Sequence, residues 1–320
     1  MTLANILVTG GTGFLGRSVC GKLVERAGGA SGRIVVPTRR IGHGRDIQML
    51  PTVRPVETNL YDDVQLARLV DGSDAVVHLV AQLHGSEADF QRVHVDLPRR
   101  LAQACAKAGV RRVVHVSALG VAADAPSRYL RSKAAGEAAL NAAGPDLTIL
   151  RPSVMFGEQD HFLNLFARLQ AVFPLLPLAG ADSRYQPVWV EDVAAAIVHC
   201  LDDQATVGQT IECAGPDQFT LRQLAEAAGR WAGHPRPVIG LPDALGRLQA
   251  LVMECLPGEP LMSRDNLDSM RVPNVAGGKL PGLARLGIRP ASLDSVVPQY
   301  LSRHQGAARL DPWRARARRL

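Results

Sequence analysis

The chain has 320 residues, 47% of them hydrophobic and 21% charged, a composition typical of a globular protein with a large core. Its net charge is +6, but +4 of it lies in the last twelve residues, and the near-neutral remainder argues against nucleic acid as a ligand. Five scattered cysteines and nine histidines show no CxxC, HxxxH or HExxH spacing, which predicts reduced core thiols and no metal site.

The beginning of the chain, MTLANILVTGGTGFLG, has neither a basic leader nor a long apolar run, and no later stretch reaches about twenty apolar residues. We therefore expect a cytoplasmic protein. The arginine-rich end, residues 311–320, is favoured as a solvated tail. The alternative is contact with anionic lipid or an acidic partner, which would hold the protein peripherally at the inner membrane face.

The first half alternates short apolar runs with longer helical patterns. Runs of Val, Ile and Leu predict strands near residues 5–10, 33–37, 52–57, 74–80, 111–117 and 147–152, with helices near 14–26, 63–71, 87–109 and 127–143 between them. Alternating helices and continuously apolar strands predict a parallel sheet covered on both faces. The fold class is therefore α/β, with a Rossmann doubly wound parallel sheet over residues 1–155.

Beyond this domain, prolines and glycines interrupt the pattern. We expect a smaller C-terminal α/β substrate or partner domain over residues 156–310, partly interleaved with the first through a returning segment near 185–200. Leu245, Leu248, Val252 and Cys255 recur there at helical spacing. Core packing is the favoured interpretation of these four side chains, with a partner-facing or lipid-facing stripe as the alternative.

The first predicted strand is followed directly by a glycine-rich loop and a helix. Gly10, Gly13 and Gly16 have a GxxGxxG spacing that permits a tight turn, close approach of a pyrophosphate and close helix packing. Thr12, Phe14 and Leu15 complete the loop and the helix start, where backbone amides face phosphate. The sequence therefore predicts a dinucleotide site.

The second strand ends in VVPTRR, without the acidic residue that grips the ribose 2'-hydroxyl in NAD sites. Arg39 and Arg40 can instead neutralise a 2'-phosphate, so NADP(H) is favoured and NAD(H) is the alternative. The alternative interpretation is that Arg39 and Arg40 are solvent-exposed side chains at a strand end and bind no phosphate.

The stretch SRYLRSKAAGE contains Tyr129 and Lys133, and no other tyrosine has a lysine four residues later. This spacing puts both side chains on one helix face, and Ser127 can cap the helix. Taken alone, the pair fits either a reaction centre or a solvated helix surface.

With the glycine loop, Ser117 after the fifth strand and the Tyr129/Lys133 pair, the chain resembles the extended or atypical short-chain dehydrogenase/reductases, the NAD-dependent epimerase/dehydratase family. SRYLRSKAAGE, LRPSVMFGEQDHFLN and LMSRDNL are most similar to the Rossmann-type nucleotide-binding accessory subunit of respiratory complex I and its bacterial relatives. The resemblance covers residues 4 to about 300.

The resemblance implies a catalytic set of Ser117, Tyr129 and Lys133. Lys133 would lower the pKa of Tyr129, which would exchange a proton with a substrate oxygen oriented by Ser117. Further cofactor contacts would be Asn59, Leu60, Val80, Ala81, Tyr129, Lys133, Pro152 and Ser153.

Some residues depart from the family pattern or carry a weaker signal. Asn59 stands where the family commonly has an acid, and LVAQ where it has an Asn-Ala pair. We expect His94 and His115 to be packed or capped, and His199 to lie on a helix face. Side chains that could line the substrate side, or be structural, are His161, Asn164, Arg184 and Tyr185.

Two functions follow from these patterns. The first is an NADP(H)-dependent oxidoreductase or epimerase/dehydratase with an unidentified small-molecule substrate. The alternative is a non-catalytic, NADPH-binding accessory or assembly protein of respiratory complex I, associated with the respiratory chain or the membrane surface. A regulator that senses the NADP(H) level is a third interpretation.

Overall fold

The computed structural model describes residues 3–29, 32–258 and 260–302. The chain divides into two compact units, each built from segments distant in sequence. Within the described residues, unit 1 combines those of 1–153, 190–214 and 276–289, and unit 2 those of 154–189, 215–275 and 290–302.

Unit 1 alternates strands with helices along its N-terminal segment. Its elements are β1 (Asn5–Thr9), α1 (Phe14–Arg26), β2 (Arg33–Thr38), η1 (Ile41–Gly44), α2 (Arg45–Gln48), β3 (Val53–Glu57), α3 (Asp63–Val70), β4 (Ala75–His78), α4 (Glu87–Phe90), η2 (Gln91–Asp96), α5 (Leu97–Ala108), β5 (Arg112–Val116), α6 (Arg128–Ala142), β6 (Asp146–Pro152), α8 (Val190–Asp202), η3 (Gln204–Thr206), β11 (Thr210–Cys213) and η4 (Leu283–Leu286).

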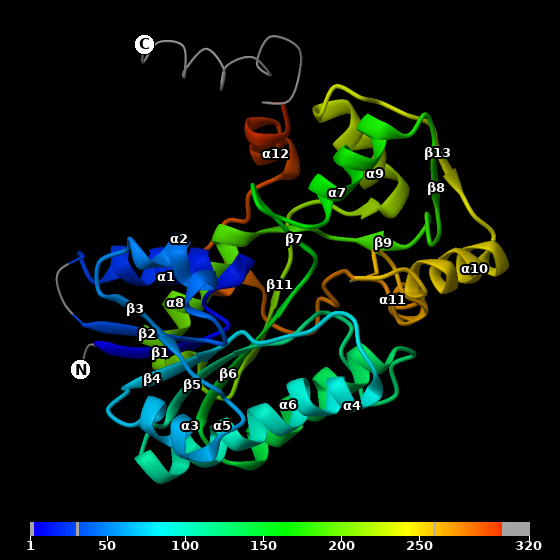
Figure 1. Cartoon of the computed structure of the whole chain (residues 1–320). Helices are drawn as coiled ribbons and strands as arrows, with labels where there is room; N and C mark the ends of the chain where they lie inside the picture. Colours follow the sequence, from blue (N-terminus) through cyan, green and yellow to red (C-terminus); the bar gives the residue numbers. More distant parts are fainter. Residues whose placement is uncertain (1–2, 30–31, 259, 303–320) are drawn as a thin grey trace. The chain divides into compact units, whose positions relative to one another are not determined.

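These strands form, within the described residues, a seven-stranded parallel sheet in the order β11-β6-β5-β4-β1-β2-β3. Helices α1 and α8 lie on one face of the sheet, and α3, α5 and α6 lie on the other (Figure 1). The central strands β4 and β5 are buried throughout, as their continuous apolar runs predict. The predicted α/β Rossmann fold is confirmed.

The segment that returns to unit 1 supplies α8 and the edge strand β11. Its attachment depends on Arg112, a side chain only 4% exposed at the start of β5. The Arg112 guanidinium donates to Thr148 Oγ1, to Thr206 Oγ1 and to the carbonyl oxygen of Cys200. A buried cation is tolerable when hydrogen-bond acceptors surround it, so these bonds hold α8 and η3 against the sheet.

Unit 2 has its own core. Its elements are β7 (Met155–Phe156), α7 (Leu163–Val172), β8 (Leu176–Leu178), β9 (Arg184–Tyr185), β10 (Val188–Trp189), β12 (Phe219–Thr220), α9 (Leu221–Trp231), β13 (Val238–Gly240), α10 (Asp243–Glu254), α11 (Arg264–Ser269) and α12 (Leu293–Leu301). Helices α7, α9 and α12 pack through buried residues such as Phe166, Leu224 and Val297. Strands β7 to β10, β12 and β13 pair only two by two in the described residues.

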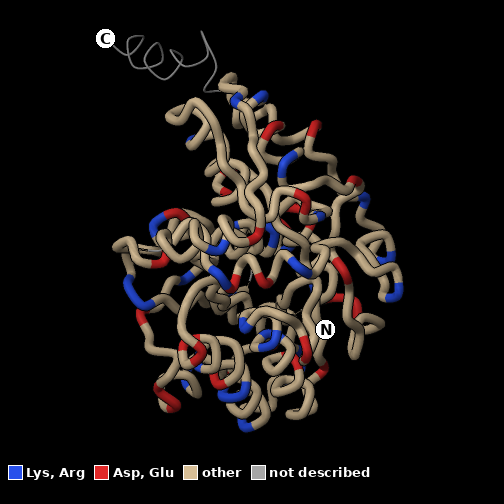
Figure 2. Tube along the Cα trace, turned by 90° about the vertical axis from the view of Figure 1, so that its right-hand side faces the viewer, with Lys and Arg blue, Asp and Glu red and all other residues tan. Residues whose placement is uncertain are grey.

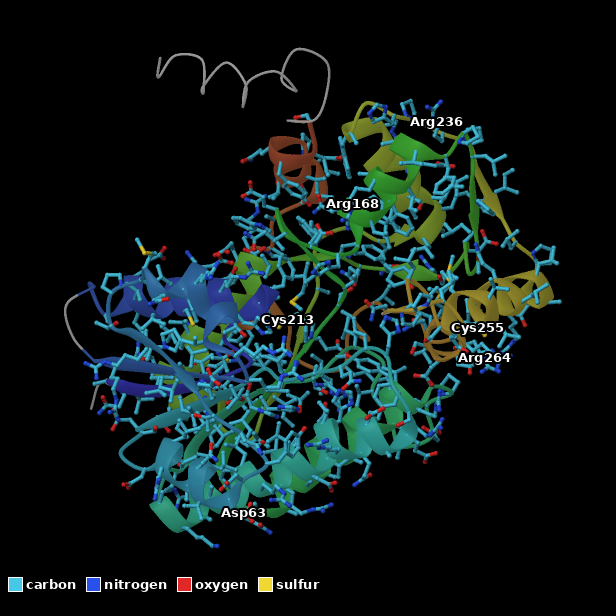
Figure 3. All side chains as sticks on the ribbon, viewed as in Figure 1. Asp63, Arg168, Cys213, Arg236, Cys255 and Arg264 are labelled. Carbon is cyan, nitrogen blue, oxygen red and sulfur yellow. The ribbon has the colours of Figure 1, made fainter. Side chains whose placement is uncertain are left out.

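Helix α10 corrects one expectation. Leu245, Leu248 and Val252 are 53%, 56% and 56% exposed, and Cys255 just after the helix is exposed (Figure 3). The buried residues of α10 are Gly246 and Ala250, so its small side chains pack inward and its leucines face out. Core packing of the stripe was therefore the wrong interpretation.

The other cysteines match their prediction. Cys20, Cys105, Cys200 and Cys213 are buried, and all five cysteines, each within the described ranges, are free. Basic and acidic positions are interspersed along the described trace (Figure 2). Among the described residues, no helix is both long and apolar enough to cross a membrane.

A candidate dinucleotide site at the carboxyl ends of the strands

The glycine loop joins β1 to α1 with backbone geometry that side chains would obstruct. Gly10 has φ +80°, and a Cβ there would lie 3.0 Å from the backbone of Leu79 and Val80. A Cβ on Gly16 would lie 2.4 Å from the carbonyl oxygen of Gly10. The loop is thus folded tightly against the helix start and the exit of β4.

The start of α1 is open. Gly13 is the N-cap and contributes no side-chain hydrogen bond, and the first turn contains no acidic residue. The amides of the first turn therefore keep free donors and the positive end of the helix dipole. Thr12, Phe14 and Leu15 occupy this junction, with Leu15 buried.

The carboxyl end of β2 carries two exposed arginines. Arg39 and Arg40 follow Thr38, whose hydroxyl donates to the carbonyl oxygen of Arg40 at 2.9 Å. The first acidic residue beyond the strand, Asp46, pairs with Arg17 at 2.6 Å. The strand end thus carries two arginines, Glu57 lies across from Thr38 on β3, and the first downstream carboxylate, Asp46, already has a partner.

Asn59, Leu60 and Tyr61 follow β3 at the same edge of the sheet. Asn59 Oδ1 accepts the N–H of Tyr61 at 3.0 Å, so this side chain shapes its own turn. Leu60 packs against the core of unit 1. The backbone N–H of Thr58 donates to the carbonyl oxygen of Thr38, and this bond places Asn59 and Leu60 beside the end of β2.

Sequence reasoning missed a group of arginines around Tyr61. The guanidinium of Arg92 lies over the Tyr61 ring, 4.1 Å from its centroid. Arg100 Nη1 donates to the Tyr61 carbonyl oxygen at 3.2 Å and pairs with Asp63 at 2.6 Å (Asp63 is labelled in Figure 3). Burial raises the pKa of Tyr61, and the charges of Arg92 and Arg39 oppose that rise. No spacing in the sequence signals this convergence, which depends on the packing of α5 and η2 against the end of β3.

Ser117 lies just beyond β5. It is 5% exposed, and its Oγ has no hydrogen-bond partner within the described residues. An unsatisfied buried hydroxyl costs about 1–3 kcal/mol, so such a group calls for an explanation such as an absent ligand. The backbone N–H of Ser117 donates to the carbonyl oxygen of Leu150, which fixes the residue at the edge of the sheet.

Lys133 lies beside Ser117. Its side chain on α6 is 2% exposed, and Nζ donates to the carbonyl oxygen of Val116 at 2.8 Å. Burial lowers the pKa of Lys133 to about 8, and the charge of Glu137 partly opposes that shift. The ammonium is thus charged at neutral pH and releases its proton more easily than an exposed lysine.

Tyr129 lies one turn earlier on α6, which begins after the Ser127 cap predicted from the sequence. Its ring meets His94 edge-on, with centroids 5.5 Å apart, and also packs against Phe90. Burial raises the pKa of Tyr129 to about 12. This direction is opposite to the lowering expected from Lys133, because desolvation of the phenolate dominates.

The exit of β4 is tied to the same region. Val80 is half-buried and Ala81 exposed, and the next residue, Gln82, donates its backbone N–H to His94 Nε2 at 3.0 Å. His94 Nδ1 lies 2.8 Å from Ser132 Oγ. His94 is therefore buried and hydrogen bonded through both ring nitrogens.

Beneath Ser117 and Lys133, two further histidines stack. His78 and His115 are cross-strand neighbours on β4 and β5 with ring centroids 5.2 Å apart. Burial first, and the Lys133 charge second, lower the pKa of His78 to about 3 and that of His115 well below its usual range. Both rings are therefore neutral packing groups. His115, expected to be packed, is 2% exposed.

Pro152 is the last residue of β6 and Ser153 follows it, and both are buried. The Pro152 carbonyl oxygen accepts a hydrogen bond from the N–H of Leu119, and the Ser153 N–H donates to the carbonyl oxygen of Cys213. They lie at the carboxyl edge of the sheet, where ligands bind in open α/β folds.

The residues predicted for the substrate side fall in unit 2. His161 is exposed, and Asn164 Nδ2 donates to the carbonyl oxygen of Glu158. Arg184 bonds Gln218, and burial raises the pKa of Tyr185 to about 12. His199, in unit 1, lies exposed on α8, as expected for a helix face. Among the described residues, no cluster of His, Cys, Asp or Glu suits a metal ion.

The open helix start, the glycine loop and the polar side chains at the strand ends define a Rossmann-fold nucleotide-binding protein. The comparison with family models gives the family. The chain belongs to the NAD-dependent epimerase/dehydratase family, whose model matches residues 6–214. Nicotinamide dinucleotide is the cofactor of that family.

Among curated proteins, the chain is 33% identical over 310 residues to the mitochondrial NADH dehydrogenase [ubiquinone] 1 alpha subcomplex subunit 9 of Mus musculus, covering 93% of this chain and 80% of that protein. It is 31% identical over 241 residues to the ceramide reductase of Caulobacter vibrioides, covering 74% of each. Among solved structures, the dTDP-glucose 4,6-dehydratase of Streptomyces venezuelae with NAD bound matches 96% of this chain and 99% of that chain, with a TM-score of 0.74 and 24% identity. The last likeness concerns the fold alone.

Proposed function

We propose that the protein is an NADP(H)-dependent oxidoreductase or epimerase/dehydratase whose working side chains are Ser117, Tyr129 and Lys133. The observation that carries this proposal is the buried Ser117 Oγ, which has no hydrogen-bond partner in the described part of the chain. Ser117 directly follows Val116, whose carbonyl oxygen accepts a hydrogen bond from the Lys133 ammonium. A buried hydroxyl beside a buried cation suits a substrate oxygen that needs a donor.

The residues present fit a nicotinamide dinucleotide. The glycine loop turns tightly at Gly10, where a side chain would meet the backbone of Leu79 and Val80, and the first-turn amides of α1 have no side-chain cap. In the proposal, Gly10 to Gly16 hold the pyrophosphate. The adenosine side is held by Asn59, Leu60, Val80 and Ala81, and the nicotinamide side by Tyr129, Lys133, Pro152 and Ser153. When bound, the cofactor supplies or accepts a hydride.

The NADP(H) preference rests on charge at the end of β2. Arg39 and Arg40 are exposed there, and the nearest downstream carboxylate, Asp46, is paired with Arg17. A 2'-phosphate needs donors and positive charge, whereas a 2'-hydroxyl is normally gripped by an acid. Arg92, stacked on Tyr61, adds a cation near the same edge.

The proton chemistry follows from the pKa shifts. Because burial raises the pKa of Tyr129 to about 12, the phenol is protonated at neutral pH and is poised to donate from Oη to a carbonyl oxygen. Ser117 Oγ would orient that oxygen, and the Lys133 ammonium would stabilise the charge left on Tyr129 Oη. A protonated phenol at this place suits proton donation to a carbonyl substrate at neutral pH.

A second candidate is a non-catalytic accessory or assembly protein of respiratory complex I that binds NADPH. Its support is the relationship to the mouse complex I subunit along 93% of the chain. The exposed apolar stripe of α10 is a further feature that an assembly contact would use. Tyr129 and Lys133 would then hold the nicotinamide ribose without chemistry.

The test is a fluorescence titration of the wild type, Arg39→Ala, Tyr129→Phe and the control Arg33→Ala with NADPH and NADH. Arg33 is an exposed arginine at the opposite end of β2. We expect Arg39→Ala to weaken NADPH binding about tenfold or more, as loss of a charged hydrogen bond does, while NADH binding and Arg33→Ala stay unchanged.

A substrate screen that follows NADPH absorbance then separates the two candidates. Turnover of a carbonyl substrate that Tyr129→Phe abolishes even at saturating NADPH supports the oxidoreductase. Tight NADPH binding without turnover, together with co-purification of complex I subunits, supports the accessory protein. Absence of NADPH and NADH binding by the wild type would refute both.

A further inference from the structure

His94 lies inside unit 1 between two parts of the candidate site. It is 2% exposed and belongs to the π-helical segment η2 between α4 and α5. Its ring stacks on Phe90 at 5.5 Å and meets the ring of Tyr129 edge-on at the same centroid distance. π-helical turns are rare and are frequent at functional sites.

The hydrogen bonds of His94 have one consistent direction. The backbone N–H of Gln82 can only donate, so His94 Nε2 is the acceptor at 3.0 Å. Burial and the charge of Lys133 lower the pKa of His94 to about 3, so the ring is neutral and its proton lies on Nδ1. Nδ1–H then donates to Ser132 Oγ at 2.8 Å, and the Ser132 hydroxyl donates to the carbonyl oxygen of Tyr129 at 2.8 Å.

This chain joins the loop after β4 to the helical turn that carries Tyr129. The loop contains Val80 and Ala81, two residues assigned to the cofactor in the proposed function. The backbone of His94 is locked to α6 as well, because a Cβ on Gly136 would lie 2.0 Å from the His94 carbonyl oxygen. Helix α6 can approach η2 this closely only at a glycine.

We propose that His94 is a positioning residue, which holds the β4 exit loop and Tyr129 in one fixed spacing so that both contact the same bound dinucleotide. The inference rests on the proposed function and adds to it a residue that touches neither cofactor nor substrate. Packing alone would not need this residue type, because phenylalanine fills a similar volume and stacks equally well on Phe90. The histidine adds two directed hydrogen bonds in a buried place, where geometry is strongly enforced.

The experiment measures NADPH and 2',5'-ADP binding by calorimetry in the wild type and in His94→Phe. The ligand 2',5'-ADP contains the adenosine and the 2'-phosphate but has no nicotinamide ribose, so Tyr129 cannot contribute to its binding. We expect His94→Phe to bind NADPH about tenfold more weakly or worse, as loss of two buried hydrogen bonds predicts, and 2',5'-ADP with a smaller loss of about threefold, because this ligand contacts the β4 exit loop but not Tyr129. A merely structural role would weaken both ligands alike.

Two further variants keep the test decisive. Phe90→Leu lowers stability without touching the hydrogen-bond chain, and its NADPH affinity is expected within about threefold of the wild type. Ser132→Ala cuts only the link to Tyr129, and a loss of about threefold to tenfold in NADPH affinity is expected. Ser132→Ala decides the question if His94→Phe does not fold.

Unchanged NADPH affinity in the folded variants, or equal losses for NADPH and 2',5'-ADP, would overturn the positioning role while leaving NADPH binding intact. A wild type that binds neither compound would instead overturn the proposed function, and the positioning role with it.

Discussion

Lys133 is a lysine held almost completely away from water, and this has a measurable consequence for stability. Its folded pKa of about 8 lies below the unfolded value of 10.5, so the unfolded chain binds more protons between these values. The contribution of Lys133 to the free energy of unfolding therefore increases with pH between about 8 and about 10.5. Below pH 8 Lys133 is charged in both states, and the cost of burying this charge reduces the stability by its full amount.

The prediction uses the difference between the wild type and Lys133→Met, because raised cysteine and tyrosine pKa values act in the opposite direction above pH 9. From pH 8 to pH 10, the wild type should gain about 2 kcal/mol relative to Lys133→Met. Urea unfolding at pH 8, 9 and 10 measures this. A constant difference across the three pH values would contradict a lowered pKa.

Residue roles could be predicted where they depend on local order. Ser117 at a strand end and Lys133 four residues after Tyr129 are placed by strand and helix geometry alone, which the sequence contains. The pKa of Tyr129 could not be predicted, because its ring is buried against Phe90 and His94, which lie 39 and 35 residues earlier in the chain. The same reason hid the contact of Arg92 with Tyr61.

At the scale of the elements, helix α1 packs so closely on the glycine loop that Gly16 has no space for a side chain, whereas Gly21 in the same helix has. A Cβ on Gly16 would lie 2.4 Å from the Gly10 carbonyl oxygen, whereas one on Gly21 in the same helix meets nothing within 4 Å. We expect Gly16→Ala to lower the free energy of unfolding by about 2–3 kcal/mol and to weaken NADPH binding.

The matched variant Gly21→Ala should raise stability by about 0.5–1 kcal/mol, because alanine loses less backbone entropy in a helix. Thermal unfolding and NADPH titration of both variants test the pair. Equal stability of the two variants would contradict the tight approach of α1 to its loop.

Helix α6 is held to β6 by a partly buried ion pair. Arg151 donates to both carboxylate oxygens of Glu137, at 3.0 and 2.5 Å, and the two side chains are 24% and 10% exposed. Glu137→Gln leaves the guanidinium without its anion, so a loss of about 2 kcal/mol is expected after allowance for the exposed part of Arg151.

The comparison is Asp46→Asn, which breaks the Arg17–Asp46 pair in which the aspartate is 65% exposed. That loss should stay below about 0.5 kcal/mol, since water already screens the pair. Guanidinium unfolding compares the two substitutions directly. Similar losses would mean that the burial of Glu137 has no energetic weight.

The sequence predicted most elements of unit 1 and missed those with short or shifted periods. Residues 87–109 were expected as one helix, but the structure divides them into α4, the π-helical η2 and α5. The π-helical turn shifts the helical spacing by one residue, which hardly changes the pattern of apolar residues, so the sequence does not reveal it. The four-residue strand β11 was missed because its burial alternates and its neighbour in the sheet, β6, lies some sixty residues earlier.

At the scale of the whole molecule, unit 1 is not a continuous stretch of chain. Residues 190–214 supply α8 and β11, and Arg112 on β5 bonds groups in that segment. We expect a fragment of residues 1–153 to lack cooperative unfolding and NADPH binding, because its sheet loses an edge strand and one face loses α8. Circular dichroism during thermal unfolding, with the full chain as control, tests this. A fragment that unfolds cooperatively and binds NADPH would refute it.

The sequence indicated such interleaving only in outline. Prolines and glycines after residue 155 suggested a change of domain, and a returning segment was placed near 185–200. In the structure, the segment that returns to unit 1 is 190–214, and unit 1 also includes residues 276–289. Gly282 in this second segment forms a β-bridge with Glu212 in the first. A bridge of this kind joins backbone groups, so no side-chain pattern reports it.

The late arrival of β11 also sets an order of events on the ribosome. The residues of β6 emerge about sixty residues before those of β11, so one edge of β6 has no partner for its backbone groups until residues 210–213 emerge. At ordinary rates of synthesis this interval lasts several seconds. The nascent protein therefore passes through a stage in which an apolar strand is open to mispairing, and a chaperone that shields this edge would raise the yield of folded chain.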